Sequence, residues 1–347
     1  MGGTHAIILA GGYGTRLLPL TARRPKHLLP VAGEPLITHQ LRWLASAGVD
    51  EVVIATSYYA EQFSPVLGDG SGLGIRLQYA HEDEPLGTAG AIAHATAYLS
   101  LDVDDCVVVL NGDQISHHDL RIQLAHFDEA RRLHDCVASI HTRVVEDARP
   151  FGLIEVGDDD RVVAFREKPT GRVAGAVNAG TYVVSPQLIS TIPTDRSVSL
   201  ERDTFPDVLS GGAHVVAHRQ DCYCLDVGTP DALVQASRDA VMAAGQQSIV
   251  RGDTTIHPRA QIGDGSFIDS GVTIARDADV SGSIVMRDAH IGAGAVITDS
   301  VVGPGAVVGA SVVMQQAAVG DDARIDDHVI LRPGDRVDVD EHVESRG

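Results

Sequence analysis

"HAIILAGGYGTRL", residues 5–17, decides the fold of the first part of this 347-residue chain. An apolar run as long as one buried strand ends in a turn that contains Gly11, Gly12 and Gly14. Glycine tolerates backbone conformations that other residues avoid, and glycine-rich turns bring N–H groups close to anions. The stretch therefore predicts a strand with an anion-binding turn at its carboxyl end.

Two common phosphate-binding motifs do not fit this turn. The dinucleotide fingerprint needs a third glycine where the chain has Leu17, and no Gly-Lys-Ser/Thr of a P-loop is present. The turn reads Gly11-Gly12-x-Gly14-Thr15-Arg16, and Lys26 follows it. Arg16 and Lys26 offer positive charge to a polyphosphate, and we expect Arg23 and Arg24 to add to it.

The formal net charge is −20 at pH 7. A negative surface argues against nucleic acids and anionic membranes as partners, and no run of about 18 apolar residues predicts a membrane span. The N-terminus lacks the features of a signal peptide, and four scattered cysteines make no disulfide framework. We expect a reduced, cytoplasmic protein, with Cys222 and Cys224 in a core rather than at a metal.

The first two-thirds of the chain predict an α/β fold. Strand-like runs alternate with helix-like segments at 35–48, 58–68, 88–99 and 120–133. This alternation predicts a Rossmann-like mixed, mostly parallel sheet that helices cover on both faces. Further strands follow residue 136, including a hairpin that turns at 157–160. A helix over 229–244 closes this part, with Thr229 as its N-cap and Pro230 in its first turn.

The last hundred or so residues follow a period of six, which neither a helix nor a flat strand produces. A triangular coil has this period, because each of its faces points one aliphatic side chain into a shared core. The fifteen positions predict about five coils of a left-handed parallel β-helix over residues 246–347. They slip in phase after Val280 and Ile297 and are Ile256, Ile262, Ile268, Ile274, Val280, Val285, Ile291, Ile297, Val301, Val307, Val313, Val319, Ile325, Leu331 and Val337.

The chain resembles the sugar-1-phosphate nucleotidyltransferases, or NDP-sugar pyrophosphorylases. The resemblance rests first on "LAGGYGTRLLPLTARRPKHLLPVA" at residues 9–32. It continues in order with "EPLGTAGA" at 84–91, "NGD" at 111–113, "FG" at 151–152, "EKP" at 167–169, "NAGTY" at 178–182, "SLERDTFP" at 199–206 and "DVGTP" at 226–230. The loop at 84–91 is most similar to that of mannose-1-phosphate and heptose-1-phosphate guanylyltransferases, and a hexapeptide-repeat tail is common in the family.

This resemblance implies a reaction that joins a nucleoside triphosphate to a sugar 1-phosphate and releases pyrophosphate. Both reacting groups are anions, so catalysis consists mainly of positioning and charge neutralisation. The resemblance assigns residues 1–245 to the catalytic domain. It also implies that Arg16 stabilises the departing pyrophosphate, that Lys26 supports the phosphates and that Lys168 holds the sugar phosphate. Asp113 and Asp226 are expected to bind Mg²⁺.

The same resemblance implies two binding surfaces. The expected nucleotide-binding residues are Leu9, Ala10, Gly11, Gly12, Gly14, Thr15, Arg16, Glu82, Pro85, Leu86, Gly87, Thr88, Asn111, Gly112 and Asp113. The expected sugar-phosphate-binding residues are Gly152, Glu167, Lys168, Asn178, Ala179, Gly180, Thr181 and Glu201.

GTP is the favoured nucleotide, because a carboxylate of the acidic cluster Glu82-Asp83-Glu84 can accept hydrogen bonds from guanine N1–H and N2–H₂. ATP and dTTP remain alternatives, and the sugar is mannose, a heptose, another hexose or a carbocyclic analogue such as valienol. We also expect a homo-oligomer that assembles through the β-helix.

Two functions of other classes remain open. A β-helix acyltransferase would use His257, His290, His328 or His342 as its base, but about five coils without a long insertion leave little to bind coenzyme A. A non-catalytic regulatory subunit would tend to lose the charged site residues, all of which this chain retains.

Overall fold

The computed structural model describes residues 2–149, 151–167 and 171–345. They form two compact units: Met1–Gly12 with Thr38–Cys224, called here the sheet unit, and Tyr13–Ile37 with Leu225–Gly347, called here the coil unit. The sequence therefore crosses three times from one unit to the other, and the glycine-rich turn contains the first crossing.

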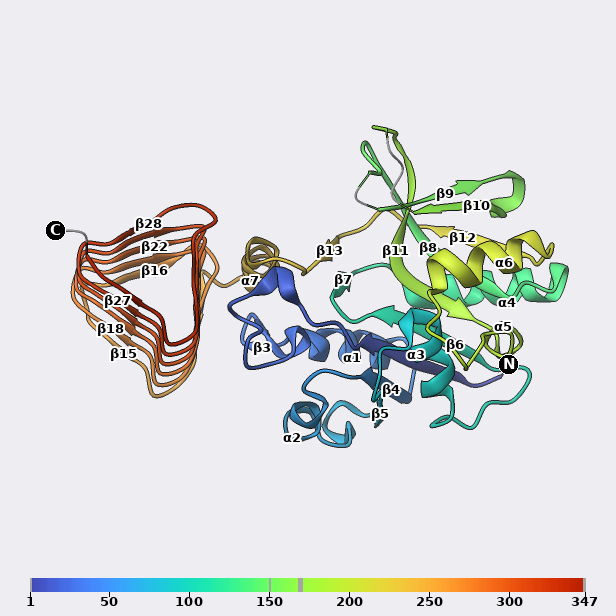
Figure 1. The fold of residues 1–347 in the computed structure, drawn as a ribbon, viewed down its shortest axis with the longest axis horizontal. Coiled ribbons are helices and arrows are strands. Elements are labelled where there is room, and N and C mark those ends of the chain that lie inside the picture. Colours follow the sequence, from blue (N-terminus) through green and yellow to red (C-terminus); the bar gives the residue numbers. More distant parts are fainter. Residues whose placement is uncertain (1, 150, 168–170, 346–347) are drawn as a thin grey trace. The chain divides into compact units, whose positions relative to one another are not determined.

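The sheet unit is built on nine strands in the order β10-β9-β11-β6-β1-β4-β5, with β8 beside β11 and β12 beside β8 (Figure 1). The strands are β1 (Thr4–Ala10), β4 (Glu51–Thr56), β5 (Arg76–His81), β6 (Cys106–Asn111), β8 (Ala138–Val145), β9 (Gly152–Val156), β10 (Val162–Glu167), β11 (Gly175–Val184) and β12 (Val215–Arg219). Strands β5, β4, β1 and β6 run parallel, and β11 joins them antiparallel to β6. The predicted Rossmann-like mixed sheet is confirmed.

Helices cover this sheet as the alternating pattern predicts. They are α1 (Leu36–Ser46), α2 (Phe63–Leu67), α3 (Gly87–Thr96), α4 (Leu120–His134), α5 (Pro186–Ile189) and α6 (Phe205–Ser210). The central strand β1 has Ala6, Ile7 and Ile8 fully buried, and every residue of β4 is buried. Strands that are apolar on both faces are stable only under such a double cover. The predicted hairpin is also present, because β9 and β10 pair antiparallel.

The coil unit contains a parallel β-helix, whose three sides are three parallel sheets (Figure 1). The first sheet, called here the inner sheet, is β14 (Ser248–Val250), β17 (Ser266–Ile268), β20 (Ile284–Val285), β23 (Val301–Val302), β26 (Ala318–Val319) and β29 (Arg336–Val337). The second is β15 (Thr255–Ile256), β18 (Thr273–Ile274), β21 (His290–Ile291), β24 (Val307–Val308), β27 (Arg324–Ile325) and β30 (His342–Val343). The third is β16 (Gln261–Gly263), β19 (Asp279–Ser281), β22 (Val296–Thr298), β25 (Val313–Gln315) and β28 (Ile330–Leu331). Sheets of six, six and five strands make between five and six coils in the described part of the chain, slightly more than predicted.

One part of the six-residue phase was wrong. The residues that fill the core are Val302, Val308 and Met314, whereas Val307 is half-exposed and Val313 is 41% exposed. Paired residues of the inner sheet are 18 apart between β14 and β17 but 17 apart between β17 and β20 and between β20 and β23, so some coils have one side of five residues. Where two valines are adjacent, the sequence pattern is compatible with either one pointing into the core. Only the packing of the β-helix shows which one does.

The inner sheet of the β-helix is also buried on its outward side. Phe267, Ile284, Val301 and Ala318 lie in register there, and each is at most 1% exposed. Helix α7 (Pro230–Ala243) packs against β17, and the backbone of Gly33 lies so close to the Phe267 ring that a Cβ would clash with it. Two segments that are far apart in the sequence, one around Gly33 and helix α7, therefore cover this face within the coil unit.

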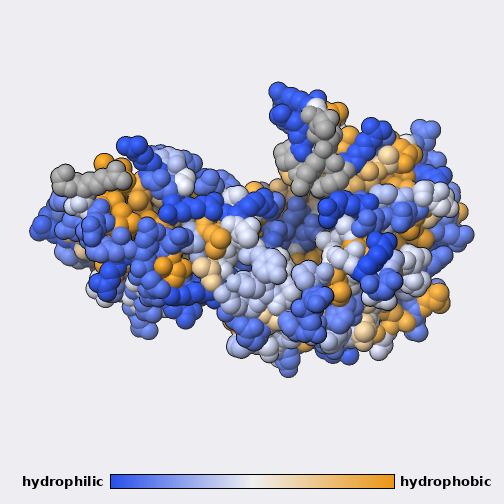
Figure 2. All heavy atoms as spheres, viewed as in Figure 1, coloured by the Kyte–Doolittle hydropathy of each residue, from blue (hydrophilic) through white to orange (hydrophobic). Residues whose placement is uncertain are grey.

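Hydrophilic side chains dominate the face in Figure 2, in keeping with the net charge of −20. No helix among the described residues is long and apolar enough to cross a membrane. Cys106 and Cys136 are buried, whereas Cys222 and Cys224, expected in a core, are half-buried.

Candidate active site

The predicted nucleotide residues of the sheet unit lie where parallel strands end. Leu9 and Ala10 end β1 and Gly11 follows it, and Gly112 donates its N–H to the Leu9 carbonyl at 3.0 Å. Ser57, just beyond β4, donates its Oγ hydrogen to the Gly11 carbonyl at 2.7 Å. The carboxyl ends of adjacent parallel strands are where α/β sheets bind ligands.

Glu82 reaches the same place from the end of β5. Its Oε2 accepts the Leu86 N–H at 3.1 Å, and its Oε1 lies 3.7 Å from where a Cβ on Gly11 would stand. Burial raises the pKa of this carboxyl, while the Leu86 N–H and the nearby His94 and His81 oppose that rise. A buried carboxylate with one oxygen directed at the glycine turn is suited to accept hydrogen bonds from a planar base.

The loop after Glu82 is built for close backbone contact. Pro85 is exposed, and Leu86 leads into α3. Gly87 has φ 76°, and a Cβ there would stand 2.4 Å from the Val198 carbonyl oxygen. Only glycine fits such a position without a backbone shift.

The "NGD" and "NAGTY" motifs meet at one point of the sheet. Gly180 has φ 72°, and a Cβ on it would stand 2.1 Å from Gln114 Oε1 and 3.1 Å from Asn111 Nδ2. Gln40 donates its side-chain N–H groups to the Asn111 and Gln114 carbonyls at 2.8 and 2.7 Å. Asp113 is half-buried and lies in the sequence between Asn111 and Gln114, just after the end of β6.

Glu201 is the centre of a hydroxyl network. It accepts hydrogen bonds from Tyr182 at 2.8 Å, Thr88 at 3.0 Å and Ser199 at 3.1 Å. Asn178 donates to the Tyr182 hydroxyl at 2.6 Å and accepts the Gly180 N–H at 3.0 Å. Glu201 therefore connects the predicted nucleotide loop with the predicted sugar segment, of which Ala179 and Thr181 are also buried.

Two other predicted sugar residues are backbone partners. Gly152 pairs with Glu167 where β9 and β10 lie antiparallel. Lys168, predicted to hold the sugar phosphate, lies outside the described residues.

In the coil unit, the rest of the glycine turn folds back on itself. Gly14 has φ 62°, and its carbonyl accepts the Thr21 hydroxyl at 2.9 Å. A Cβ on Gly14 would stand 3.2 Å from Lys26 Cβ, so the lysine stem lies against the turn. Thr15 in this turn is exposed, as is Gly12, the last residue of the preceding segment of the sheet unit.

Arg16 and Asp226 come together although 210 residues separate them. Arg16 Nη2 lies 3.6 Å from Asp226 Oδ2, and the two side chains are 64% and 41% exposed. A Cβ on Gly228 would stand 2.4 Å from Arg16 Nη2, so this glycine leaves room for the guanidinium. An exposed cation beside an exposed carboxylate is ready to exchange that contact for a phosphate and a metal ion.

Arg23 and Arg24 do not fit the expected role of added cations at the turn. Both form ion pairs with aspartates of the β-helix, described below. Sequence reasoning also missed Ser57, Gln40, Gln114 and Tyr182. Of these, only Tyr182 could have been found from the sequence, as the last residue of the "NAGTY" motif. The other three contact residues that are tens of positions away in the sequence, and a local motif does not show such contacts.

Comparisons with known proteins agree with this geometry. Residues 5–242 match the profile of the family described as nucleotidyl transferase, and residues 245–337 match that of the GMPPB C-terminal domain. A mannose-1-phosphate guanylyltransferase of Mycobacterium tuberculosis is 37% identical over 79% of this chain and 76% of its own length.

Two solved structures are similar to the chain. Crystalline HddC from Yersinia pseudotuberculosis, complexed with GMP-PN, has a TM-score of 0.58 and 28% identity, and the match covers 69% of this chain and 100% of that one. A putative glucose-1-phosphate thymidylyltransferase from Bacillus anthracis has a TM-score of 0.61 and 26% identity, with coverage of 69% and 95%.

Proposed function

The chain belongs to the nucleotidyl transferase family, and from that premise we propose that it joins GTP to mannose 1-phosphate and releases pyrophosphate. The observation that carries this proposal is Glu82, whose carboxylate lies beside Gly11 at the end of β1. Guanine presents N1–H and N2–H₂ on one edge, and a carboxylate accepts both. The guanylyltransferase relative and the GMP-PN complex of HddC support the same base.

In the proposed reaction, an oxygen of the sugar phosphate attacks the α-phosphorus of the triphosphate. The bond to the β-phosphate oxygen breaks, and pyrophosphate leaves with the electron pair. We propose that N–H groups of Gly11, Gly12, Gly14 and Thr15 bind the triphosphate and that Arg16 neutralises the charge of the departing pyrophosphate.

The other cations have separate proposed tasks. Lys26, held against Gly14, supports the phosphates at the reacting centre, and Lys168 holds the sugar phosphate in line. Each is a compact point charge in a chain whose other basic side chains are all arginines.

Nucleotidyltransferases of this family generally use a divalent metal, and we propose Mg²⁺ with Asp113 and Asp226 as its protein ligands. Among the described residues, no three His, Cys, Asp or Glu side chains gather into a metal site. Mg²⁺ typically binds one or two carboxylates together with phosphates and water, so this donor set fits it. When bound, the ion neutralises phosphate charge in the transition state.

On the sugar side, we propose that Asn178 to Thr181, Gly152 and Glu167 bind mannose hydroxyls. Three hydroxyl groups donate to the carboxylate of Glu201, which is also predicted to bind the sugar. We propose that Glu201 positions Thr88 and Tyr182. We further propose that residues 1–245 act as the catalytic domain in the cytoplasm.

The decisive experiment measures pyrophosphate release with Mg²⁺ from GTP, ATP, dTTP, CTP and UTP, each with mannose, glucose and heptose 1-phosphates. We expect the highest kcat/KM with GTP and mannose 1-phosphate. A preference for dTTP with glucose 1-phosphate would favour the function named for the Bacillus anthracis structure. Absence of turnover with every pair would leave a non-catalytic subunit.

We also propose that the β-helix joins copies of the chain into a homo-oligomer. Val296, Val313 and Ile330 form an in-register outward column on the third sheet, and they are 39%, 41% and 66% exposed. Copies with a charge of −20 repel one another, so an uncharged apolar column is where they approach most readily. We expect Ile330→Lys to lower the mass found by sedimentation, whereas Ile122→Lys, at an exposed site on α4, leaves it unchanged.

A further inference from the structure

The segment that carries Arg16 and Lys26 is attached to the last coils of the β-helix. Leu18 and Arg23–Arg24 lie between these two cations in the sequence, and each contacts a late coil. We call residues 18–24 the tether. These contacts belong to the coil unit. The ion-pair partners follow β26 and β29, Arg336 lies within β29, and Met286, which Arg24 also contacts, follows β20.

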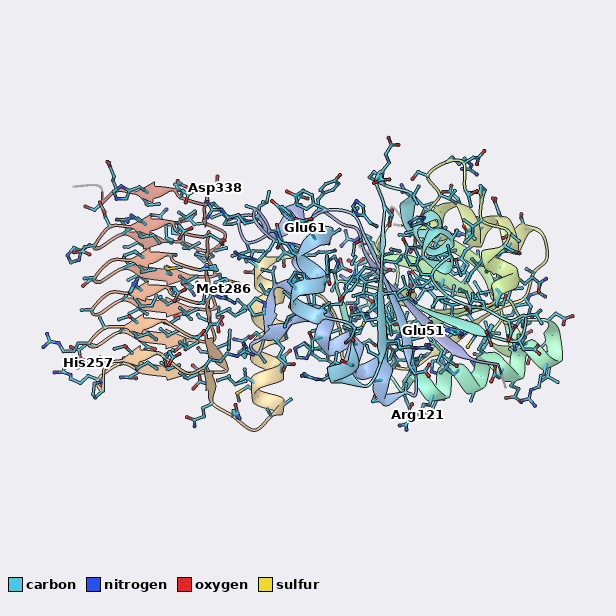
Figure 3. The ribbon with its side chains drawn as sticks, turned by 90° about the horizontal axis from the view of Figure 1, so that it is seen from below. Glu51, Glu61, Arg121, His257, Met286 and Asp338 are labelled. Atoms are coloured by element: carbon cyan, nitrogen blue, oxygen red, sulfur yellow. The ribbon has the colours of Figure 1, made fainter. Side chains whose placement is uncertain are left out.

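Arg24 makes the most enclosed of these contacts. Its guanidinium donates to both carboxylate oxygens of Asp321, with Nη1 to Oδ1 at 3.1 Å, and its Nη1 lies 4.0 Å from Met286 Sδ. The side chains of Arg24 and Asp321 are only 21% and 6% exposed. Met286 lies on the opposite side of the coil stack from His257, which identifies the side on which the tether is held (Figure 3).

Arg23 spans two successive coils. Its Nη1 donates to Asp322 at 2.7 Å and its Nη2 to Asp340 at 2.6 Å. Asp340 in turn donates its backbone N–H to the Asp321 carbonyl, so the two aspartate turns are stacked. A forked guanidinium is suited to two carboxylates held at a fixed spacing.

Arg336 of β29 fixes the other end of the tether. Its Nη1 donates to the Leu18 carbonyl at 2.8 Å. Between the two ends, Thr21 holds the Gly14 carbonyl and Leu20 is fully buried. The tether is thus held at both ends by the β-helix and in its middle by the glycine turn itself.

We propose that the last coils of the β-helix position Arg16 and Lys26 for the triphosphate, with Arg24 and Asp321 as the principal positioning residues. The expected effect on GTP binding rests on the proposed function, whereas the anchoring of the tether by the β-helix does not. A loop that approaches polyphosphate through backbone N–H groups needs a fixed conformation, and ordering it in advance strengthens binding. The β-helix therefore contributes to substrate binding as well as to assembly.

The first test measures hydrogen exchange of the free protein over residues 13–29. We expect Arg24→Gln and Asp321→Asn each to increase exchange in this segment at least about tenfold, because a charge-assisted fork is lost. Arg24→Lys keeps the charge but loses the fork, so it should give an intermediate increase.

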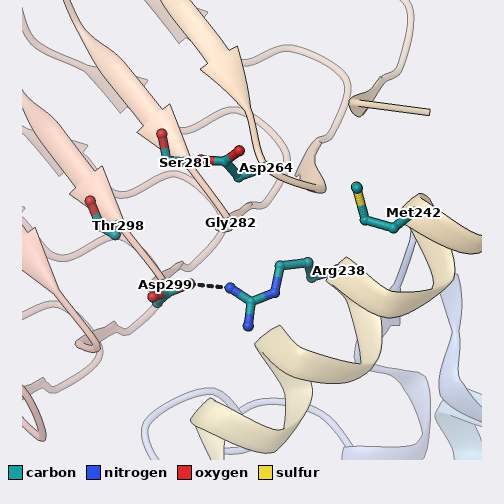
Figure 4. Close-up of a pocket in the computed structure, with 7 residues that line it drawn as sticks. All are labelled: Arg238, Met242, Asp264, Ser281, Gly282, Thr298 and Asp299. Carbon is teal, nitrogen blue, oxygen red and sulfur yellow. Dashed lines mark hydrogen bonds and ion pairs between the residues drawn. The ribbon is translucent and has the colours of Figure 1, made fainter. Parts of the chain in front are cut away.

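The matched control is Arg238→Gln. Arg238 Nη1 donates to Asp299 at 2.7 Å and so joins α7 to the same β-helix, at a cavity of about 350 Å³ whose lining includes no residue of the tether (Figure 4). This variant should leave exchange over residues 13–29 unchanged. Unchanged exchange in the Arg24 and Asp321 variants as well would overturn the proposal.

The second test separates positioning from general stability. In both tether variants we expect the KM for GTP to rise about tenfold, while the KM for mannose 1-phosphate changes less than about twofold. The double variant Arg24→Asp with Asp321→Arg restores the ion pair and should recover most of the GTP affinity. Equal rises in both KM values, together with a lower melting temperature, would reduce the tether to a structural role.

The two proposals fail in different ways. If the wild-type chain turns over no GTP but the variants still lose exchange protection, the proposed function falls and the anchoring stands. If Arg24 and Asp321 variants do not fold, Arg23→Gln replaces them, because Arg23 is 43% exposed and its loss leaves no buried charge.

Discussion

The two units hold their functional side chains by different means. In the sheet unit, Glu82, Asn178 and Glu201 are fixed by hydrogen bonds among buried or half-buried groups at strand ends. In the coil unit, Arg16 is exposed, and its segment is held through ion pairs with the β-helix. Buried hydrogen-bond networks resist salt, whereas exposed ion pairs weaken as salt increases. The comparison indicates that the proposed base- and sugar-binding residues are held rigidly, while the proposed phosphate-binding segment depends on a distant anchor.

The largest expected effect lies in the coil unit. Replacing Asp226 by Asn removes the charge that pairs with Arg16 and serves the proposed Mg²⁺. We expect kcat to fall by about 100- to 1000-fold without unfolding, because the side chain is partly exposed. Steady-state pyrophosphate release and thermal melting measure the two quantities. Asp264→Asn, on an exposed aspartate of the β-helix, is the control, and an Asp226 variant as active as this control would remove Asp226 from the metal site.

The second prediction concerns acid stability, which should differ between the units. His118 and His141 are buried in the sheet unit with ring centroids 3.8 Å apart, and burial lowers their pKa values to about 3 and about 4. Because both imidazoles have a lower pKa in the folded protein than in the unfolded chain, where it is about 6.5, unfolding takes up protons below pH 6.5. Their contribution to stability is complete above about pH 6.5 and is lost as the pH falls toward about 4. Each histidine should cost about 1.4 kcal/mol of unfolding free energy per pH unit in that window.

Denaturant unfolding between pH 7.5 and 5 checks this slope for the sheet unit. His141→Gln should lower the slope by up to about 1.4 kcal/mol per pH unit, since the variant takes up one proton fewer on unfolding. In the β-helix, His290, His328 and His342 are exposed, so acid should affect that unit less. A sheet unit whose stability is independent of pH in this range would contradict the prediction.

A smaller effect is expected in base selectivity. Glu82→Gln keeps the shape of the side chain but replaces one acceptor oxygen by a donor. We expect the ratio of kcat/KM for GTP over ATP to fall about 10- to 100-fold, because a buried hydrogen bond to guanine is lost. Asp83→Asn, at a 99% exposed side chain next to it, should leave the ratio unchanged. If both variants retain selectivity, guanine is read elsewhere.

The smallest expected effect is that of Tyr182→Phe. The variant removes the hydroxyl that joins Asn178 to Glu201, at a fully buried position. We expect a loss of about 1 kcal/mol in stability and a rise of about threefold in the KM for mannose 1-phosphate, with the KM for GTP unchanged. Tyr79→Phe, which removes a hydroxyl bonded to the Gly68 carbonyl on the surface, is the control. A larger effect on GTP than on the sugar would place this network on the nucleotide side.

Much of the fold could be predicted because its signals are local. The apolar run of β1, the N-cap at Thr229 and the six-residue period follow from backbone geometry over a few residues. The period failed only at Val301–Val313, where neighbouring valines suit either phase. The positions of Glu82 and Asp113 at strand ends also follow from local pattern, together with the rule for parallel sheets.

The sequence by itself determined the alternation of strands and helices, the coil repeat and the residue types at the proposed site. Only the tertiary structure decided which groups those residues meet. From the sequence, Arg23 and Arg24 are expected to add positive charge beside the glycine turn, yet they pair with carboxylates 299 and 297 residues away. A local sequence pattern determines the backbone conformation over one or two turns. The partner of a long charged side chain is decided by how distant segments pack together, and a local pattern does not show that packing.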